Sequence, residues 1–158
     1  MNNFYKVSYD QYCDAVGGDA NLVEEYNDIR LPRRATVCSA GYDFYAPCSF
    51  ALEPGEGIKI PTGVGVLLDD DKFLGLVPRS GLGFKYRFQL DNTFGVIDAD
   101  YSGAKGGGHI MAKVTNNGSK RLEIKKGDAF MQGIILQYFK TDDDETSEIR
   151  VGGFGSTG

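Results

Sequence analysis

Two carboxylates and a tyrosine lie close together in the segment 95–103, which reads Gly-Val-Ile-Asp-Ala-Asp-Tyr-Ser-Gly. Asp98 directly follows an apolar run, so a short strand would hold its carboxylate in place and partly remove it from water. A carboxylate fixed in this way is suited to act as a general base on a water molecule. Tyr101 offers a flat face for a sugar or a base. The alternative is an ordinary β-hairpin in which Asp and Gly serve the geometry of the turn.

An arginine, a hydroxyl and a glycine follow one another at Arg79, Ser80 and Gly81. Guanidinium donors, a hydroxyl and an accessible backbone N–H can together surround phosphate oxygens. Gln132 is a polar residue within an apolar run, and if it is buried it needs a polar partner, which a phosphate oxygen would supply. The alternatives are a strand-to-turn connection with an exposed arginine and a glutamine tolerated on an edge strand.

The last segment, 142–158, places an arginine and an aromatic residue in a glycine-rich setting. Arg150 supplies charge, Phe154 can stack on a base, and Gly155 and Ser156 supply backbone and hydroxyl donors. Because the segment has almost nothing to bury except Phe154, we expect a mobile arm that closes over a ligand. A disordered glycine-rich tail is the alternative.

Other kinds of chemistry are disfavoured by the residues that are scarce. The chain has one histidine, His109, and three cysteines without a CxxC pair: Cys13, Cys38 and Cys48. We therefore expect neither a zinc site nor a disulfide framework. No GxSxG nucleophile elbow is present, so acid–base chemistry is expected to rest on carboxylates. His109 begins a predicted strand and is expected to have a structural or surface role.

The elements that must position these residues are short strands. Apolar runs separated by turn residues, at a spacing of roughly 8–12 residues, are typical of a β-sandwich or barrel. In the segment 109–115, alternation predicts that Ile110, Ala112 and Val114 face a core and that Lys113 points away. The runs are Gly57–Ile60, Val64–Leu68, Phe73–Val77, Phe94–Ile97, Ile110–Thr115 and Ala129–Phe139.

The first 30 residues differ from the rest, since their apolar residues have a loosely helical spacing that predicts one or two short helices broken at Gly17-Gly18. The whole chain of 158 residues suits one domain. With 17 Lys and Arg against 22 Asp and Glu, it is not expected to bind nucleic acid. No apolar run approaches the ~20 residues of a membrane span, and no signal peptide begins the chain. We expect a cytoplasmic protein without a membrane partner.

In order and spacing, five segments resemble the motifs of the trimeric, all-β dUTPases, the deoxyuridine triphosphate nucleotidohydrolases. The resemblance covers about residues 31–158, and Leu31-Pro32 together with Lys-Gly-Asp-Ala-Phe-Met-Gln is similar to the branch found in Gram-positive bacteria and their phages. The five segments are Ser39–Phe44, Pro78–Gly83, Gly95–Gly103, Gly127–Gln132 and Gly152–Gly158.

The resemblance implies an all-β, jelly-roll-like barrel or sandwich. Residues 1–30 would form a short helical extension that packs on or flanks the core, residues 31–141 the β domain, and residues 142–158 a linker and flexible arm that closes the active site. The resemblance also implies a homotrimer in which each active site uses residues from three subunits.

The activity that the resemblance implies is hydrolysis of dUTP to dUMP and pyrophosphate, which keeps uracil out of DNA and supplies dUMP for thymidylate synthesis. Asp98 would activate the water that attacks the α-phosphorus. Tyr101 would pack on the deoxyribose and leave no room for a 2′-hydroxyl, and the hairpin Asn92–Tyr101 would read uracil through backbone hydrogen bonds. The cofactor would be Mg²⁺, held by the triphosphate and water rather than directly by the protein.

Further residues are implied by their match to the motifs. Asp43 and Asp100 would support the site without direct chemistry. Substrate contacts would come from Arg79, Ser80, Gly81, Asn92, Gly95, Val96, Ile97, Met111, Gln132, Arg150, Phe154, Gly155 and Ser156.

The chain departs from the family pattern in three places. Ala129 stands where many members have an arginine, and Arg150 lies four residues before Phe154 instead of five. The turn Lys105–Gly108 is longer than in the shortest members.

Two further functions compete with dUTP hydrolysis. One is a dUTP-sensing regulatory protein with a protein partner, for which the N-terminal segment could be the contact. The other is a dCTP deaminase, whose fold and phosphate motifs are shared; it fits the segment 95–101 and the arm less well. Composition alone would also allow a jelly-roll capsid or sugar-binding module, which leaves the Arg-Ser-Gly and Asp-x-Asp-Tyr segments unexplained.

Overall fold

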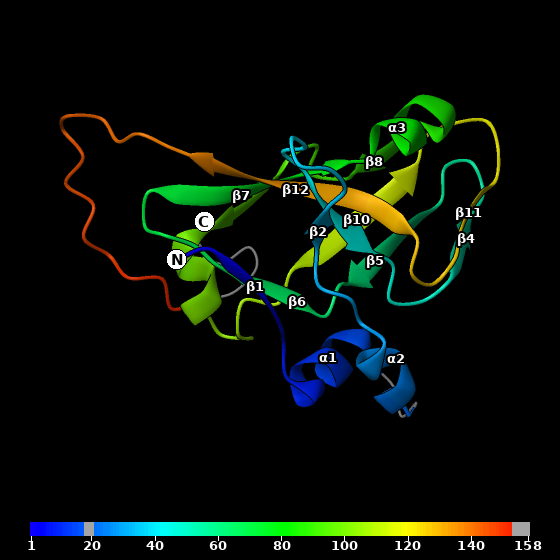
Figure 1. Cartoon of the computed structure of the whole chain (residues 1–158), viewed down its shortest axis with the longest axis horizontal. Coiled ribbons are helices and arrows are strands. Elements are labelled where there is room, and N and C mark those ends of the chain that lie inside the picture. Colours follow the sequence, from blue (N-terminus) through cyan, green and yellow to red (C-terminus); the bar gives the residue numbers. More distant parts are fainter. Residues whose placement is uncertain (18–20, 153–158) are drawn as a thin grey trace.

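The computed structural model describes residues 1–17 and 21–152 as a sandwich of short antiparallel strands with small helices at its ends (Figure 1). The strands are β1 (Asn3–Lys6), β2 (Arg33–Arg34), β3 (Tyr42–Tyr45), β4 (Phe50–Leu52), β5 (Gly57–Pro61), β6 (Val64–Leu67), β7 (Lys72–Pro78), β8 (Phe88–Leu90), β9 (Gly95–Asp98), β10 (Met111–Asn116), β11 (Leu122–Ile124) and β12 (Ala129–Gln137). The helices are α1 (Tyr9–Val16), α2 (Val23–Asn27), α3 (Ser80–Tyr86) and the 3₁₀ helix η1 (Ala99–Gly103).

Two sheets form the body of the sandwich. The larger has the strand order β2–β3–β12–β7–β9, and the smaller has the order β5–β10–β8. Two further antiparallel pairs, β1 with β6 and β4 with β11, complete the β structure. This arrangement confirms the predicted all-β, jelly-roll-like fold.

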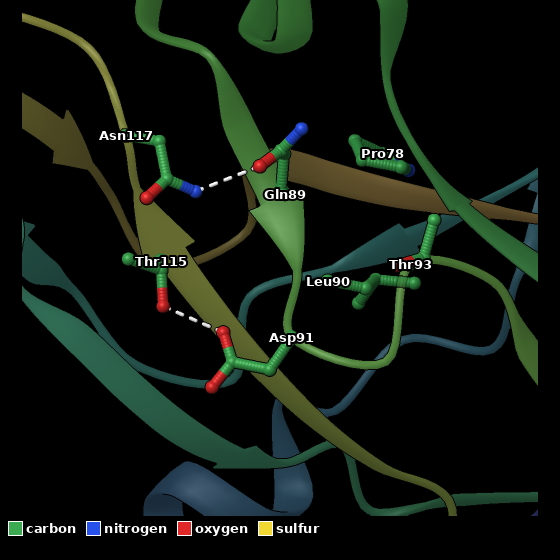
Figure 2. Close-up of a pocket in the computed structure, with 7 residues that line it drawn as sticks. All are labelled: Pro78, Gln89, Leu90, Asp91, Thr93, Thr115 and Asn117. Atoms are coloured by element: carbon green, nitrogen blue, oxygen red, sulfur yellow. Dashed lines mark hydrogen bonds between the residues drawn. The ribbon is translucent and has the colours of Figure 1, made fainter.

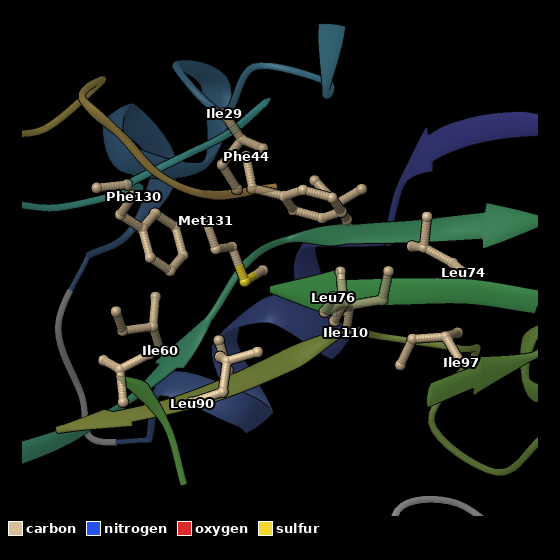
Figure 3. Close-up of a cluster of buried hydrophobic side chains, with 14 of the residues drawn as sticks. Ile29, Phe44, Ile60, Leu74, Leu76, Leu90, Ile97, Ile110, Phe130 and Met131 are labelled. Carbon is tan, nitrogen blue, oxygen red and sulfur yellow. The ribbon is translucent and has the colours of Figure 1, made fainter. Parts of the chain in front are cut away.

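The hydrophobic core lies between the two sheets (Figure 3). Leu74 and Met131 from the larger sheet are fully buried, and Ile60 from the smaller sheet is nearly so. The predicted alternation in β10 is confirmed, because Ile110, Ala112 and Val114 are buried while Lys113 is exposed. Burial of each large apolar side chain stabilises the fold by roughly 1.5–3 kcal/mol.

The six predicted apolar runs correspond to β5, β6, β7, β9, β10 and β12. Six other strands were missed, and each of them is only two to four residues long. Such a segment contains at most two periods of in–out alternation, which is too little to stand out from the surrounding turns. These segments are strands because they pair with other strands, and their own sequences carry no clear strand pattern.

The predicted helices near the N-terminus are confirmed as α1 and α2. Helix α1 begins with a capping box, in which the Gln11 N–H donates to Ser8 Oγ and the Ser8 N–H donates to Gln11 Oε1. It ends at Gly17, whose φ of 77° suits glycine. Strand β1 precedes α1 and pairs with β6, so this segment is attached to the sandwich by a strand as well as by helices. The division of the chain at residues 30 and 141 stays a prediction.

After β12 the described chain, up to residue 152, forms neither a helix nor a strand. Figure 1 shows it swinging away from the sheets and returning toward the region of η1. The predicted mobility of the arm stays a prediction. Within the described ranges, no helix has the length and apolarity that crossing a membrane requires.

Candidate active site

A cavity of about 480 Å³ gathers most of the residues that the sequence singled out around segment 95–103. We call it the aspartate pocket. Its floor comes from β9 and β10, and its rim from the connection between β8 and β9 and from the C-terminal chain. The predicted residues that line it are Asn92, Gly95, Val96, Ile97, Asp98, Tyr101, Met111 and Arg150.

Strand β9 positions Asp98 at the rim of this pocket. It pairs with β7, which places Ile97 opposite Leu74 and Asp98 opposite Phe73. Ile97 is buried and anchors the strand, whereas the Asp98 side chain is 48% exposed. Among the described residues no further strand lies beyond β9 in its sheet. An edge strand leaves backbone N–H and C=O groups unpaired, and these can bind a planar polar ligand.

Within the predicted hairpin Asn92–Tyr101 the structure has one strand, β9, followed directly by η1, so the hairpin prediction is wrong. Strand β8 pairs with β10, and β9 pairs with β7, so residues 91–94 cross between the two sheets. Thr93 at the crossing has a φ of 67°, a strained conformation for a β-branched residue. Phe94 holds the crossing in place, because its ring fills the space left by Gly75. A Cβ at Gly75 would lie 2.4 Å from Phe94 Cζ.

Tyr101 forms a fixed wall of the aspartate pocket. It is 9% exposed, and its hydroxyl donates to the backbone oxygen of His109 at 2.9 Å. Burial raises the pKa of Tyr101, so the phenol stays a neutral donor at physiological pH. The ring therefore has little freedom to move away from a ligand.

Arg150 from the C-terminal chain lies inside the aspartate pocket. Its Nη2 pairs with Asp98 Oδ2, and its Nε pairs with Asp100 Oδ1 at 2.8 Å. The guanidinium carbon lies 5.9 Å from the centre of the Tyr101 ring. The Arg150 side chain is only 13% exposed, and it pairs with the Asp98 carboxylate without burying it, because the Asp98 side chain stays 48% exposed. The other predicted arm residues, Phe154, Gly155 and Ser156, lie outside the described residues.

A second group of predicted residues lies at the far end of β7, and we call it the arginine cluster: Asp43, Arg79, Ser80, Gly81 and Gln132. Asp43 Oδ1 lies 3.4 Å from Arg79 Nε and orients that side chain. Gln132 lies across from Asp43 in the pairing of β12 with β3, and its Nε2 donates to the backbone oxygen of Pro78 at 3.4 Å. Three motifs that are distant in sequence thus meet here.

Gly41 makes the packing within the arginine cluster possible. A Cβ at this position would lie 2.2 Å from Gln132 Oε1, so only glycine leaves room for the amide. Ser80 and Gly81, at the start of α3, are exposed, and a Cβ at Gly81 would meet no atom of the described residues within 4 Å. The part of the cluster around Gln132 is therefore packed, whereas the part with Ser80 and Gly81 is exposed.

Asp98 of the aspartate pocket and Arg79 of the arginine cluster lie far apart within one chain. Asp98 is opposite Phe73 near the start of β7, whereas Arg79 follows Pro78 at its end. Six residues of extended strand separate the two points by about 20 Å. The structure therefore brings the predicted residues together in two groups, not one.

The sequence analysis missed three charged residues that line the aspartate pocket: Lys59, Asp91 and Lys113. Lys59 and Lys113 are directly opposite in the pairing of β5 with β10. Asp91 Oδ2 lies 3.2 Å from Lys113 Nζ. A hydrogen bond from Thr115, followed by the charge of Lys113, lowers the pKa of Asp91. Alternation put Lys113 on the outward face, but nothing in the sequence indicated that this face borders the pocket.

A second cavity of about 480 Å³ adjoins the aspartate pocket and shares Leu90 and Asp91 with it. Figure 2 shows that its polar side chains bond to one another, Thr115 with Asp91 and Asn117 with Gln89. None of the predicted site residues that the structure describes lines it. Because its side chains already satisfy each other, we do not assign it to the site.

Metal binding can be judged from the carboxylates of the aspartate pocket. Within residues 1–17 and 21–152, no three His, Cys, Asp or Glu side chains are grouped so that they could hold an ion. Mg²⁺ is commonly bound through one or two carboxylates together with substrate phosphates. The adjacent carboxylates of Asp98 and Asp100 fit an ion that arrives with a phosphate ligand.

Comparison with known proteins agrees with this geometry. A sequence model of the dUTPase family matches residues 27–158. The deoxyuridine 5′-triphosphate nucleotidohydrolase of Lactococcus lactis is 37% identical over 142 residues, which are 87% of this chain and 95% of that protein. The dUTPase of Streptococcus mutans superposes with a TM-score of 0.67 and 26% identity, covering 88% of this chain and 98% of that one.

A more distant structure agrees in fold alone. The dUTPase of phage phi11 of S. aureus, described with a structural Mg(II) ion, has a TM-score of 0.66 and 20% identity, and it covers 94% of this chain and 97% of that one. The family resemblance that the motifs indicated is confirmed by the family match and by the two closer relatives. This chain belongs to the dUTPase family.

Proposed function

We propose that this protein hydrolyses dUTP to dUMP and pyrophosphate, with Asp98 as the general base. In this reaction the oxygen of a water molecule forms a bond to the α-phosphorus. The bond from that phosphorus to the oxygen that bridges the α- and β-phosphates breaks, and pyrophosphate leaves. Asp98 accepts the proton of the water. Membership of the family supports the reaction, and the observation that carries the assignment is the Asp98 carboxylate at the rim of the aspartate pocket, beside Tyr101.

The nucleoside would be recognised by the edge of β9 and by Tyr101. Uracil presents both a donor and acceptors, which suit the unpaired backbone groups of Gly95–Ile97. Tyr101 would pack on the deoxyribose. Because its ring is buried and its hydroxyl is bonded, it would resist displacement by a 2′-hydroxyl, so UTP would be a poor substrate.

The phosphates would be bound by the arginine cluster of another copy of the chain. Arg79, Ser80 and Gly81 offer the donors that phosphate oxygens require, yet they lie about 20 Å along β7 from Asp98 in the same chain. A triphosphate is too short to bridge that separation. This separation supports an active site shared between copies of the chain, and the family resemblance implies that the copies form a homotrimer.

Arg150 would change partners when the nucleotide binds. Without ligand it pairs with Asp98 and Asp100. A triphosphate carries more negative charge than two carboxylates and accepts bidentate hydrogen bonds from arginine. Binding would draw Arg150 onto the phosphates, free Asp98 from its ion pair so that it can take the proton of the water, and bring the arm with Phe154, Gly155 and Ser156 over the nucleotide.

Mg²⁺ would be held by the triphosphate and by water, near Asp98 and Asp100, and would neutralise phosphate charge and fix the phosphate conformation. The tasks of the chain itself are to orient the nucleoside, place the water and take its proton. A cytoplasmic site of action completes the proposal, because dUTP is an intermediate of DNA-precursor metabolism.

The test is pyrophosphate release from dUTP with Mg²⁺, measured beside UTP, dTTP and dCTP for the wild type and for Asp98→Asn. We expect release from dUTP alone, and a loss of about 10²–10⁴-fold in kcat for the variant with nucleotide binding retained. Undiminished turnover by Asp98→Asn would overturn the role of Asp98.

Two other outcomes would replace the proposal. An absence of pyrophosphate release, combined with thermal stabilisation by dUTP, would favour a dUTP-sensing protein. Ammonia release from dCTP would indicate a deaminase.

A further inference from the structure

The two parts of the chain that depart most from a minimal β domain, the N-terminal segment and the long turn after η1, contact each other directly. Tyr5 Oη donates to the backbone oxygen of Gly107 at 2.8 Å. A Cβ at Gly107 would lie 2.0 Å from Gln11 Nε2. Strand β1 and helix α1 therefore enclose the turn from one side, and this turn forms part of the chain between Tyr101 and His109.

The turn has few side chains of its own to hold its shape. Gly106, Gly107 and Gly108 have φ values of 99°, 64° and 68°, a run that only glycine adopts without strain. Three successive glycines contribute no side-chain contacts, and within the turn the Gly107 N–H donates to the oxygen of Ala104 at 2.9 Å. The hydroxyl of Tyr5 supplies a second restraint, from outside the turn.

The pairing of β1 with β6 fixes the position of Tyr5. Tyr5 lies opposite Gly65 in the register of β1 with β6, and a Cβ at Gly65 would lie 2.3 Å from Tyr5 Cζ. The ring thus fills the space that glycine leaves and points its hydroxyl at the turn. Burial, and then the neighbouring Tyr101, raise the pKa of Tyr5, so its hydroxyl remains a donor.

His109, which follows the turn, connects the turn to the aspartate pocket. The backbone oxygen of His109 accepts the hydroxyl of Tyr101. The His109 ring is buried: its Nε2 accepts from the Gly63 N–H at 2.8 Å, and it packs on Tyr12 of α1 with a centroid distance of 6.1 Å. The N-terminal segment thus fixes both the turn and the residue to which Tyr101 is bonded.

We propose that Tyr5 is a positioning residue that, through the Gly106–Gly108 turn and His109, holds Tyr101 against the sugar and so sets the preference for a deoxyribonucleotide over a ribonucleotide. The inference rests on the proposed function. Rejecting a nucleotide because of one extra hydroxyl requires a side chain that cannot move aside. How far the Tyr101 ring can move depends on the groups that support it. The role of the N-terminal segment would therefore be specificity, exerted without contact with the substrate.

The test compares Tyr5→Phe with Tyr26→Phe. Tyr26 is a matched control, because it is also half-buried in the N-terminal region and its hydroxyl also donates to a backbone oxygen, that of Val7 at 2.6 Å, away from the turn. Two ratios are measured for the wild type and both variants: kcat/KM for dUTP over UTP, and the Kd for UMP over dUMP.

We expect Tyr5→Phe to lower both ratios by about three- to tenfold, mainly because the ribonucleotide is accepted better. Tyr26→Phe should leave both ratios at the wild-type value, and the two variants should lose similar thermal stability. Ratios that are unchanged in Tyr5→Phe, or lowered equally in both variants, would overturn the proposal.

The binding ratio separates this inference from the proposed function. If the wild type released no pyrophosphate from dUTP, the proposed reaction would be wrong. The Kd values of UMP and dUMP would still measure whether Tyr101 excludes the 2′-hydroxyl. A wild type that bound the two monophosphates equally would contradict the inference, whether or not dUTP is hydrolysed. Gly107→Ala provides a second route, since its Cβ would displace Gln11 and its φ would be strained; it should shift the ratios in the same direction as Tyr5→Phe.

Discussion

The aspartate pocket and the arginine cluster are built in opposite ways, although both contain predicted binding residues. In the aspartate pocket, Tyr101 is buried and bonded at its hydroxyl, and Ile97 anchors β9. In the arginine cluster, the Arg79 side chain is 45% exposed, and Gly81 has open space around it. In the first group the tyrosine is enclosed within one chain, whereas the second group presents its donors outward.

This difference shows how selection of the sugar and binding of the phosphates can be assigned to different parts of the structure. Discrimination of the sugar requires a rigid surface, which a single folded chain provides. Phosphate binding requires charge and donors that can adapt to a flexible triphosphate, and an exposed arginine supplied by a neighbouring subunit meets that need. The comparison predicts that the two groups can be inactivated in different chains.

The largest effect is expected from mixing two inactive variants. Asp98→Asn and Arg79→Ala should each lose about 10²–10⁴-fold in kcat/KM as pure proteins. If a site takes Asp98 from one chain and Arg79 from another, refolding the two variants together should restore activity to part of the sites. Pyrophosphate release from dUTP measures the recovery.

The control for this experiment mixes Asp98→Asn with a Tyr101→Ala variant. Both residues line the same aspartate pocket, so no combination of these chains can make a complete pocket. Equal activity in the two mixtures, or no recovery with Arg79→Ala, would contradict the division of the site between chains.

The sequence could predict the aspartate pocket better than its surroundings. Asp98 and Tyr101 lie within one short segment, so their proximity follows from local geometry. The run that became β10 alternates clearly, whereas those that became β7 and β12 stand out as long apolar runs. Asp43 and Gln132 meet only because β3 pairs with β12. The motif resemblance indicated that both serve the site, but the contact itself depends on strand order.

Other features depended on tertiary contacts that no local pattern encodes. The hairpin expected at Asn92–Tyr101 was wrong because β9 pairs with β7, which precedes it in the chain, and then continues into η1. His109 was expected to be structural or at the surface, and it is buried because α1 covers it. Lys59 carries no local signal at all, since its place at the pocket comes from the pairing of β5 with β10.

A second prediction concerns the rigid side of the comparison, where burial lowers the pKa of His109 from 6.5 to about 4. Between these values the unfolded chain binds more protons than the folded one, so the free energy of unfolding should fall as the pH is lowered from about 6.5 to about 4. The expected loss is about 1–3 kcal/mol. Denaturant unfolding at several pH values measures it.

His109→Gln isolates this contribution from that of the carboxylates. Its side chain offers an acceptor to the Gly63 N–H but does not titrate, so the stability of this variant should depend less on pH across the same window. Parallel curves for the two proteins would show that His109 does not carry the effect. Through the backbone of His109, acid should also loosen Tyr101, and the preference for dUMP over UMP should weaken in parallel.

The smallest effect is expected in the open group, from Gly41→Ala. The new Cβ would lie 2.2 Å from Gln132 Oε1 and 3.4 Å from Gln132 Cβ, so the flexible end of the glutamine must turn away while the strands remain in place. We expect a several-fold rise in KM for dUTP, corresponding to about 1 kcal/mol for a lost hydrogen bond, with little change in thermal stability. Gly83→Ala, where a Cβ meets nothing within 4 Å, is the matched control and should keep the wild-type KM. A large loss of stability in Gly41→Ala would instead mean that the arginine cluster is as rigid as the aspartate pocket, and the contrast between the two would fail.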